Sequence, residues 1–323
     1  PARNAPLDPE KERKHKEEYK ERRIAAYSTP FGIAGYPPPV KSALEETEEE
    51  RQAIYESKWQ EGGSISYLFA YKDLLLNKSA NDTASEFVRN KIRETVKDPV
   101  TAELLCPDNH PIGTKRLILD SQYYEIFNQG NVDLVDVRSA PIQEITENGI
   151  KTADNEYELD AIAFATGFDA RTGAMKEINI SVDGGTNIEE QWGDGPQTYL
   201  GLMVAEMPNM FMITGPQSPG VKSQMILSIE WHVNWIAECL AHMINSDHTR
   251  VMAKEDAQRR WVDHVREVAN STLYPLANSW YMGANIPGKP RVFMPYVAGV
   301  EAYTKECNRI VEEGYEGFEF STN

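Results

Sequence analysis

In the first third of the chain apolar residues recur at helical spacing, and no alternating strand pattern occurs there. Thr47 and Glu50 form a capping box that predicts the start of one helix. A connector rich in proline and glycine runs from Pro30 to Pro39. We expect helices at residues 8–27, 47–62, 67–75 and 82–97. Residues 1–111 are therefore predicted to be mostly helical.

Beyond Cys106 the pattern changes to short apolar runs, which indicate strands. Asn148-Gly149 predicts a type I′ turn that joins two of them in a hairpin. The run Asp160–Asp169, DAIAFATGFD, is typical of a strand buried on both faces of a parallel sheet. We expect strands at residues 117–119, 132–137, 142–145, 150–152, 161–165 and 209–213, and a hairpin-like stretch at 178–182.

Two long helices are expected towards the end of the chain, from Met225 to Ile244 and from Lys254 to about Asn270. The mixture of strands and helices predicts an α/β fold. The inward face of the first helix is expected to consist of Ile229, Val233, Ile236, Leu240 and Met243.

Composition excludes several classes of protein. The net charge of −17 argues against a nucleic-acid partner, because a polyanion would be repelled. No apolar run approaches the roughly 18 residues of a membrane helix, so we expect no membrane partner. The three cysteines are far apart and in no CxxC pattern, so we expect buried thiols in a reduced, cytoplasmic setting. Six scattered histidines predict no metal site. A length of 323 residues suggests about two domains.

The apolar run at residues 161–165 ends in Thr166-Gly167. Ligands of open α/β sheets lie outside the carboxyl ends of the strands, so a glycine there lets a nucleotide approach the main chain. A buried strand ending in an ordinary glycine turn is the alternative, and composition does not separate the two. The segment resembles the ATG segment of FAD- and NADPH-dependent oxidoreductases. No GxGxxG occurs anywhere, so we expect the chain to be the C-terminal portion of a longer flavoprotein.

Three segments, Gly113–Leu117, Ala165–Gly173 and Ser279–Arg291, carry a more specific likeness. They resemble FAD- and NADPH-dependent Baeyer–Villiger monooxygenases, especially the phenylacetone and steroid monooxygenase group. The resemblance covers the whole chain and corresponds to the later three-fifths of a family member. It implies an α/β fold with parts of two Rossmann-like dinucleotide-binding domains, for FAD and NADP, and without the N-terminal FAD-binding βαβ unit.

The resemblance also implies a division of the chain into three parts. Residues 1–111 would form a helical insertion of the NADP domain, residues 112–168 the remainder of that domain, and residues 169–323 the C-terminal portion of the FAD domain. The implied enzyme converts a ketone to an ester or lactone with O2 and NADPH, through a flavin C4a-peroxide.

Arg116 matches the active-site arginine of that family. A guanidinium keeps its charge in a dry site and suits an anionic peroxide and a developing oxyanion. Lys115 matches the lysine that meets the 2′-phosphate of NADP, which favours NADPH over NADH. Without the resemblance, the simplest interpretation of Arg116 is a surface ion pair, and that of Lys115 is a solvated cation.

Further residues follow from the same resemblance. Trp280 matches a tryptophan on a mobile loop near the nicotinamide and the substrate, although a tryptophan merely packed under a loop is the alternative. Lys222 departs from the apolar residue expected in the substrate pocket, which leaves substrate size and polarity open. The other cofactor-binding residues are expected to be Thr166, Gly167, Asp169 and the backbone of Met225. The substrate pocket is expected to include Trp280 and the loop Pro219, Gly220, Val221 and Lys222.

Two other functions stay open. One is a related flavin monooxygenase that oxidises nitrogen or sulfur, and the other is a non-catalytic, truncated fold-mate. Because neither glycine-rich pyrophosphate loop is present, we expect the 323-residue chain by itself to bind no FAD.

Overall fold

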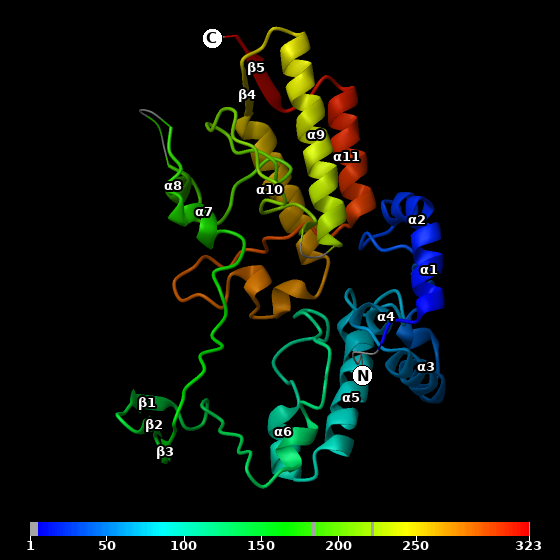
Figure 1. Ribbon diagram of the computed structural model, residues 1–323, viewed down its shortest axis with the longest axis vertical. Coiled ribbons are helices and arrows are strands. Elements are labelled where there is room, and N and C mark those ends of the chain that lie inside the picture. Colours follow the sequence, from blue (N-terminus) through cyan, green and yellow to red (C-terminus); the bar gives the residue numbers. More distant parts are fainter. Residues whose placement is uncertain (1–5, 183–184, 186, 221–222, 323) are drawn as a thin grey trace.

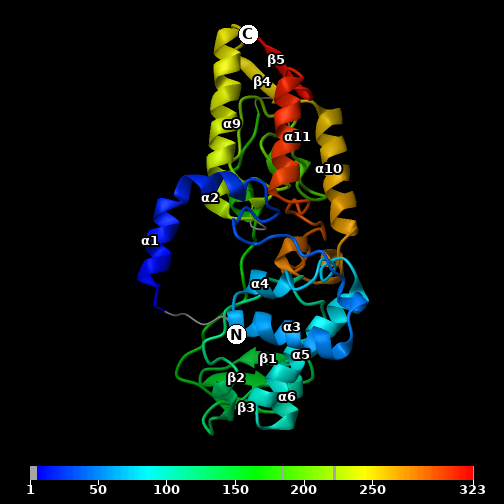
Figure 2. The same ribbon diagram turned by 90° about the vertical axis from the view of Figure 1, so that its right-hand side faces the viewer.

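The computed structural model describes residues 6–182, 185, 187–220 and 223–322 (Figure 1). The charged N-terminal segment forms α1 (Pro9–Glu17) and α2 (Tyr19–Ala26), and Asp8 caps α1 through its side chain. α1 buries no residue, as expected for a solvated surface helix. Figure 2 shows α1 standing to one side of the remaining helices.

The predicted helical region is confirmed. It contains α3 (Glu48–Glu61), α4 (Ser64–Leu68), α5 (Lys78–Thr95) and α6 (Pro99–Leu105), with a 3-10 turn at Ala43–Glu45. The capping box forms, because Thr47 accepts from the backbone of Glu50 while Glu50 accepts from that of Thr47. The helix expected at 67–75 is wrong, because α4 ends at Leu68 and residues 69–76 form turns and bends. An aromatic core joins these helices, with Tyr55, Tyr67 and Phe87 buried in it.

A small antiparallel sheet contains β1 (Ile142–Ile145), β2 (Gly149–Thr152) and β3 (Glu156–Glu158) in that order. The predicted hairpin between β1 and β2 is confirmed, with Ile145 opposite Ile150. The predicted type I′ turn is wrong, since neither Asn148 nor Gly149 has a positive φ.

Four expected strands do not form. The segments 117–119, 132–137, 161–165 and 209–213 make no ladder within the described chain. The run at 161–165, which was expected to be a buried strand, is instead largely exposed, and Phe164 in it is 71% exposed. In the segment 117–119, Ile118 is 89% exposed. Figure 1 shows this run as a single extended trace between β3 and α7 (Gly173–Glu177). A strand is held by a continued ladder of hydrogen bonds to its neighbours. Asn209 donates its backbone N–H to the carbonyl of Val251 in the later segment 250–253 at 2.9 Å, but this contact does not continue as a ladder.

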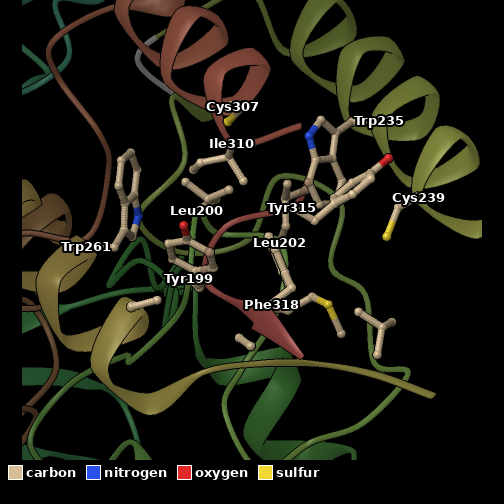
Figure 3. Close-up of a cluster of buried hydrophobic side chains, with 14 of the residues drawn as sticks. Tyr199, Leu200, Leu202, Trp235, Cys239, Trp261, Cys307, Ile310, Tyr315 and Phe318 are labelled. Atoms are coloured by element: carbon tan, nitrogen blue, oxygen red, sulfur yellow. The ribbon is translucent and has the colours of Figure 1, made fainter. Parts of the chain in front are cut away.

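The C-terminal region is built on α9 (Met225–Asn245), α10 (Glu255–Asn270) and α11 (Val300–Glu312), which stand together in both views (Figure 1, Figure 2). β4 (Arg250–Ala253) pairs with β5 (Phe318–Ser321) in antiparallel register. Between these elements Trp235, Trp261 and Phe318 belong to one buried cluster (Figure 3). The shorter elements are α8 (Ile188–Gln191) and 3-10 turns at Glu125–Asn128, Tyr274–Leu276 and Trp280–Met282.

The predicted length of α9 is confirmed, but its predicted inward face is partly wrong. Val233 and Leu240 are 45% and 43% exposed, whereas Met243 is buried. The buried stripe instead runs through Ser228, His232, Trp235, Cys239 and Met243. His232 can be buried because both ring nitrogens are bonded: Nδ1 accepts from the backbone N–H of Thr214 at 2.7 Å, and Nε2 lies 3.0 Å from the Tyr303 hydroxyl. Burial and the nearby Arg171 lower the pKa of His232 to about 4, so it is neutral at pH 7.

The expectation of buried thiols is confirmed, since Cys106, Cys239 and Cys307 are all buried and free. Burial raises the pKa of Cys239 to about 12, which keeps its thiol protonated and unreactive. In the described part of the chain, no helix is long and apolar enough to cross a membrane. The same residues contain no cluster of three side chains able to hold a metal ion.

Candidate active site

The segment that carries Lys115 and Arg116 has a backbone defined by Gly113. Gly113 has φ +82°, and a Cβ there would meet Leu68 at 2.7 Å and Leu75 at 2.8 Å. Only glycine avoids both the strained φ and this contact. Thr114 is fully buried, and its hydroxyl donates to the Pro111 carbonyl at 2.6 Å. The turn before the two cations is therefore fixed by packing and by a local hydrogen bond.

Asn81 on α5 fixes the same turn through hydrogen bonds to its backbone. This role was not predicted from the sequence. Its amide nitrogen donates to the carbonyls of Ile112 at 2.9 Å and Leu74 at 2.6 Å, and its amide oxygen accepts from the Ile112 N–H at 2.9 Å. Asn81 is fully buried. A buried amide must find partners. Asn81 precedes the helix expected at residues 82–97, so the periodic pattern contained no signal for this role.

Arg116 lies on the wall between two cavities. The first, here called the Arg116 cavity, has a volume of about 360 Å³ and is also lined by Met225 and Tyr281. The second, the Trp59 cavity, has a similar volume of about 360 Å³ and lies towards α3 and α5. Lys115 lines both cavities as well. The structure thus brings the neighbouring residues Lys115 and Arg116 together with Met225, which is far from them in the sequence.

Both cations are available for a ligand. Arg116 is largely exposed, Lys115 is half-buried, and neither has a carboxylate within ion-pair distance among the described residues. The alternative of Arg116 in a surface ion pair is therefore not what the described chain shows. Burial raises the pKa of the Tyr281 phenol, and the positive charge of Arg116 partly offsets that rise. The charge of Arg116 thus acts within the cavity.

The N-terminus of α9 forms another part of the Arg116 cavity. The side chain of Gln224 caps the helix by accepting from the backbone of Leu227, and its own N–H donates to the Phe31 carbonyl at 2.9 Å. Met225 is the first residue of the helix, where backbone N–H groups lack intrahelical partners. The positive end of the α9 dipole and Arg116 therefore lie at the same cavity.

Trp280 does not itself line the Arg116 cavity. Its ring lies 4.2 Å from that of Tyr281, which does line it, and Trp280 packs half-buried against an apolar cluster. Trp280 is thus packed under its loop, as the alternative interpretation predicts. Its sequence neighbour Tyr281 forms part of the cavity wall.

Asp169 joins the end of the ATG segment to the loop that follows Trp280. Its carboxylate forms an ion pair with Lys289, whose Nζ also donates to the Ala170 carbonyl at 3.1 Å. The Lys289 side chain is only 8% exposed. Asn285 in the same loop donates to the Phe168 carbonyl at 3.0 Å, and it lies close to Gly167, whose φ is +87°. Gly167 and Asp169 thus contact the 285–289 segment, while Thr166 stays exposed on the extended trace.

The predicted substrate loop is described only in part. Pro219 lines a third cavity of about 320 Å³, and Val221 and Lys222 lie outside the described residues. Gly220 has φ +36°, and a Cβ there would lie 2.5 Å from the guanidinium of Arg171. Arg171 donates to the Gly215 carbonyl at 2.7 Å, and burial lowers its pKa to about 10. The beginning of this loop is thus packed on a cation that sequence reasoning did not single out.

Known proteins with similar sequences are monooxygenases. The chain is 39% identical to a Baeyer–Villiger monooxygenase of Pseudooceanicola batsensis and 38% identical to cyclohexanone 1,2-monooxygenase of Acinetobacter sp., over 88% and 86% of its length. It is also 37% identical, over 86% of its length, to a phenazine N-monooxygenase of Lysobacter antibioticus. The chain spans 51% of each of these relatives. No protein-family profile matches it.

The solved structures with a similar fold include monooxygenases bound to NADP. An oxidized steroid monooxygenase bound to NADP superposes with a TM-score of 0.89 at 42% identity, covering 98% of this chain and 59% of that one. Cyclohexanone monooxygenase from Rhodococcus sp. Phi1, bound to NADP+, gives a TM-score of 0.95 at 33% identity over the whole chain and 60% of its own. The predicted α/β class is confirmed by these matches. Along most of its own length the chain is homologous to Baeyer–Villiger monooxygenases, and it spans about half the length of the relatives that it matches.

Proposed function

We propose that the protein to which this chain belongs is an FAD- and NADPH-dependent monooxygenase that converts a ketone to an ester or lactone with O2. The observation that carries the proposal is the cavity that Arg116 and Met225, the first residue of α9, both line. Among the described residues no carboxylate lies within ion-pair distance of Arg116. The family relationship supports it, because relatives such as cyclopentanone 1,2-monooxygenase act on ketones by their names. Three buried free thiols favour a reducing, cytoplasmic setting.

The residues fit the cofactors in the following way. FAD, when bound, would supply the oxygen-activating chemistry, and the first backbone N–H groups of α9 at Met225 would hold its polar edge. Lys115 would bind the 2′-phosphate of NADP from the Trp59 cavity, since an ammonium suits a phosphate oxygen. Thr166, Gly167 and Asp169 would line the path between the nucleotide-binding regions, and Trp280 would cover the nicotinamide. We propose residues 1–111, 112–168 and 169–323 as the corresponding parts of the domains.

Arg116 would act as an electrostatic catalyst. A guanidinium stays protonated in a dry cavity, so it can hold negative charge on activated oxygen and on the oxyanion that forms when the ketone is attacked. Its position on the wall between two cavities lets it also orient the nicotinamide cofactor. The loss of one such donor typically costs about 10²–10³ in rate.

The test uses the protein in a preparation that carries FAD. Ketone-dependent oxidation of NADPH and formation of an ester are expected. In Arg116→Ala, ester formation should fall by about 10²–10³ while reduction of the flavin by NADPH survives. Arg138→Ala is the matched control, since that arginine is exposed, paired with Asp136 and outside both cavities. Ester formation at the normal rate by the Arg116 variant would refute the role.

Oxidation of nitrogen is a second candidate, favoured by the 37% identity to a phenazine N-monooxygenase. The same preparation distinguishes the two reactions when it is offered a ketone and an aromatic N-heterocycle such as phenazine in separate assays. Turnover of the heterocycle alone, with its N-oxide as product, would establish the second candidate and exclude the first.

A further inference from the structure

The turn of the β1–β2 hairpin contains a chemically reactive pair of residues. Asn148 is the only asparagine in the sequence that is followed directly by glycine. It lies between the end of β1 and the start of β2, and it is exposed. Figure 1 shows this small sheet standing apart from the helices. Water therefore reaches the turn.

An asparagine in this setting can lose its side-chain amide without a catalyst. The backbone nitrogen of Gly149 forms a bond to the Cγ of Asn148, and the side-chain nitrogen leaves as ammonia with the proton of the Gly149 N–H, which closes a succinimide ring. Water then opens the ring at either of its carbonyls. One product is aspartate, and the other is isoaspartate, in which the main chain continues through Cγ. A side chain on the attacking residue hinders ring closure, and glycine has none.

Asn155 provides a comparison within the same sheet. It lies in the turn between β2 and β3 and is also exposed, but Glu156 follows it. Its backbone N–H donates to the Thr152 hydroxyl at 3.2 Å, and its carbonyl accepts from the Thr152 N–H at 2.8 Å. Asn148 and Asn155 thus share exposure to water and differ in the residue whose nitrogen would attack.

We propose that Asn148 is a site of spontaneous deamidation, at which aspartate and isoaspartate accumulate in the folded protein. Water is the only co-reactant, and no electron is transferred. The inference is independent of the proposed function, since it involves neither Arg116 nor a cofactor.

The backbone around Asn148 leaves no room for the isoaspartate product. The Asn148 carbonyl accepts from the Leu159 N–H at 2.9 Å, directly after β3. A Cβ on Gly149 would lie 1.8 Å from the Tyr157 carbonyl oxygen, so backbone packs against backbone there. Isoaspartate inserts an additional carbon into the main chain, which moves these groups out of register.

Deamidation also adds a negative charge to a segment that is already acidic. Among residues 142–158 five side chains are carboxylates, and Lys151 is the only cation. Like charges on adjacent strands destabilise a sheet. Both products therefore weaken the pairing of β3 with β2, and with it the anchoring of the run 159–168 that follows β3.

The test incubates the folded 323-residue chain at mildly alkaline pH and maps its peptides by mass spectrometry. Aspartate and isoaspartate are quantified at positions 148 and 155 in the same digest, so that Asn155 is the internal control. We expect modification of Asn148 to be at least about tenfold faster than that of Asn155, because glycine leaves the attacking nitrogen unhindered. Asn148→Gln is the control variant, since the longer side chain must close a larger ring, and position 148 should stay unmodified in it.

Hydrogen exchange measures the structural consequence. After the same incubation, peptides that cover residues 156–160 should exchange at least about threefold faster in the unsubstituted chain than in Asn148→Gln, because loss of the β2–β3 pairing is a local opening. Equal rates of modification at Asn148 and Asn155 overturn the site. Modification of Asn148 that leaves this exchange at the level of the incubated Asn148→Gln variant overturns the consequence for β3.

Discussion

Replacement of Asn81 by alanine should loosen the turn that carries Lys115 and Arg116. The substitution leaves three backbone groups without their partners: the N–H and carbonyl of Ile112 and the carbonyl of Leu74. Each buried group left unpaired costs about 1–3 kcal/mol. The Ser85 hydroxyl, 3.4 Å from the Ile112 N–H, can partly replace one bond. A local destabilisation of about 3 kcal/mol is therefore expected.

Hydrogen exchange measured by mass spectrometry provides the assay. A loss of about 3 kcal/mol corresponds to exchange about 100-fold faster in peptides that cover residues 111–116, where opening is local. Asn90→Ala is the matched control, because Asn90 is exposed on the same helix and the gain in helix propensity is the same. If Asn81→Ala accelerates exchange of this segment by less than about fivefold relative to Asn90→Ala, the amide does not hold the turn.

Three further substitutions test the fold around the site. Gly113→Ala should destabilise the chain by at least about 2 kcal/mol in urea unfolding, because of its positive φ and blocked Cβ, whereas Gly130→Ala, with open space, should change it by less than about 0.5 kcal/mol. His232 has a pKa of about 4 in the fold, below its ordinary value of 6.5, so unfolding takes up a proton. The contribution of neutral His232 to the free energy of unfolding should therefore be fully present above pH 6.5 and be lost as the pH falls towards 4. His232→Gln should make the free energy of unfolding less dependent on pH in this range, and an equal pH dependence in the variant would contradict the assignment. Lys289→Met should lower the melting temperature and expose the loop after Trp280 to protease, whereas Lys305→Met, whose ion pair is largely exposed, should do neither; equal effects would show that the Lys289 pair has no special role.

Local signals in the sequence were read correctly where the interaction is itself local. The capping box at Thr47, the termination of α3 at Gly62 and the β1–β2 hairpin each depend on residues within a few positions of one another. The long helices α9 and α10 follow from periodicity over many residues. The same reasoning failed for the face of α9, because buried Ser228 and His232 have bonding partners that the sequence does not reveal.

The sequence by itself determined the helical first third, the likeness to Baeyer–Villiger monooxygenases, and the cations at positions 115 and 116 as candidate ligand-binding residues. The tertiary structure decided what those residues meet. Asn81 clamps their turn, Met225 shares a cavity with Arg116, and Asp169 pairs with Lys289 from 120 positions away. The strand expected at 161–165 stays unpaired for the same reason: a strand, a cavity wall or a buried ion pair exists only where distant segments meet. Periodicity along one segment carries no information about its neighbours in space.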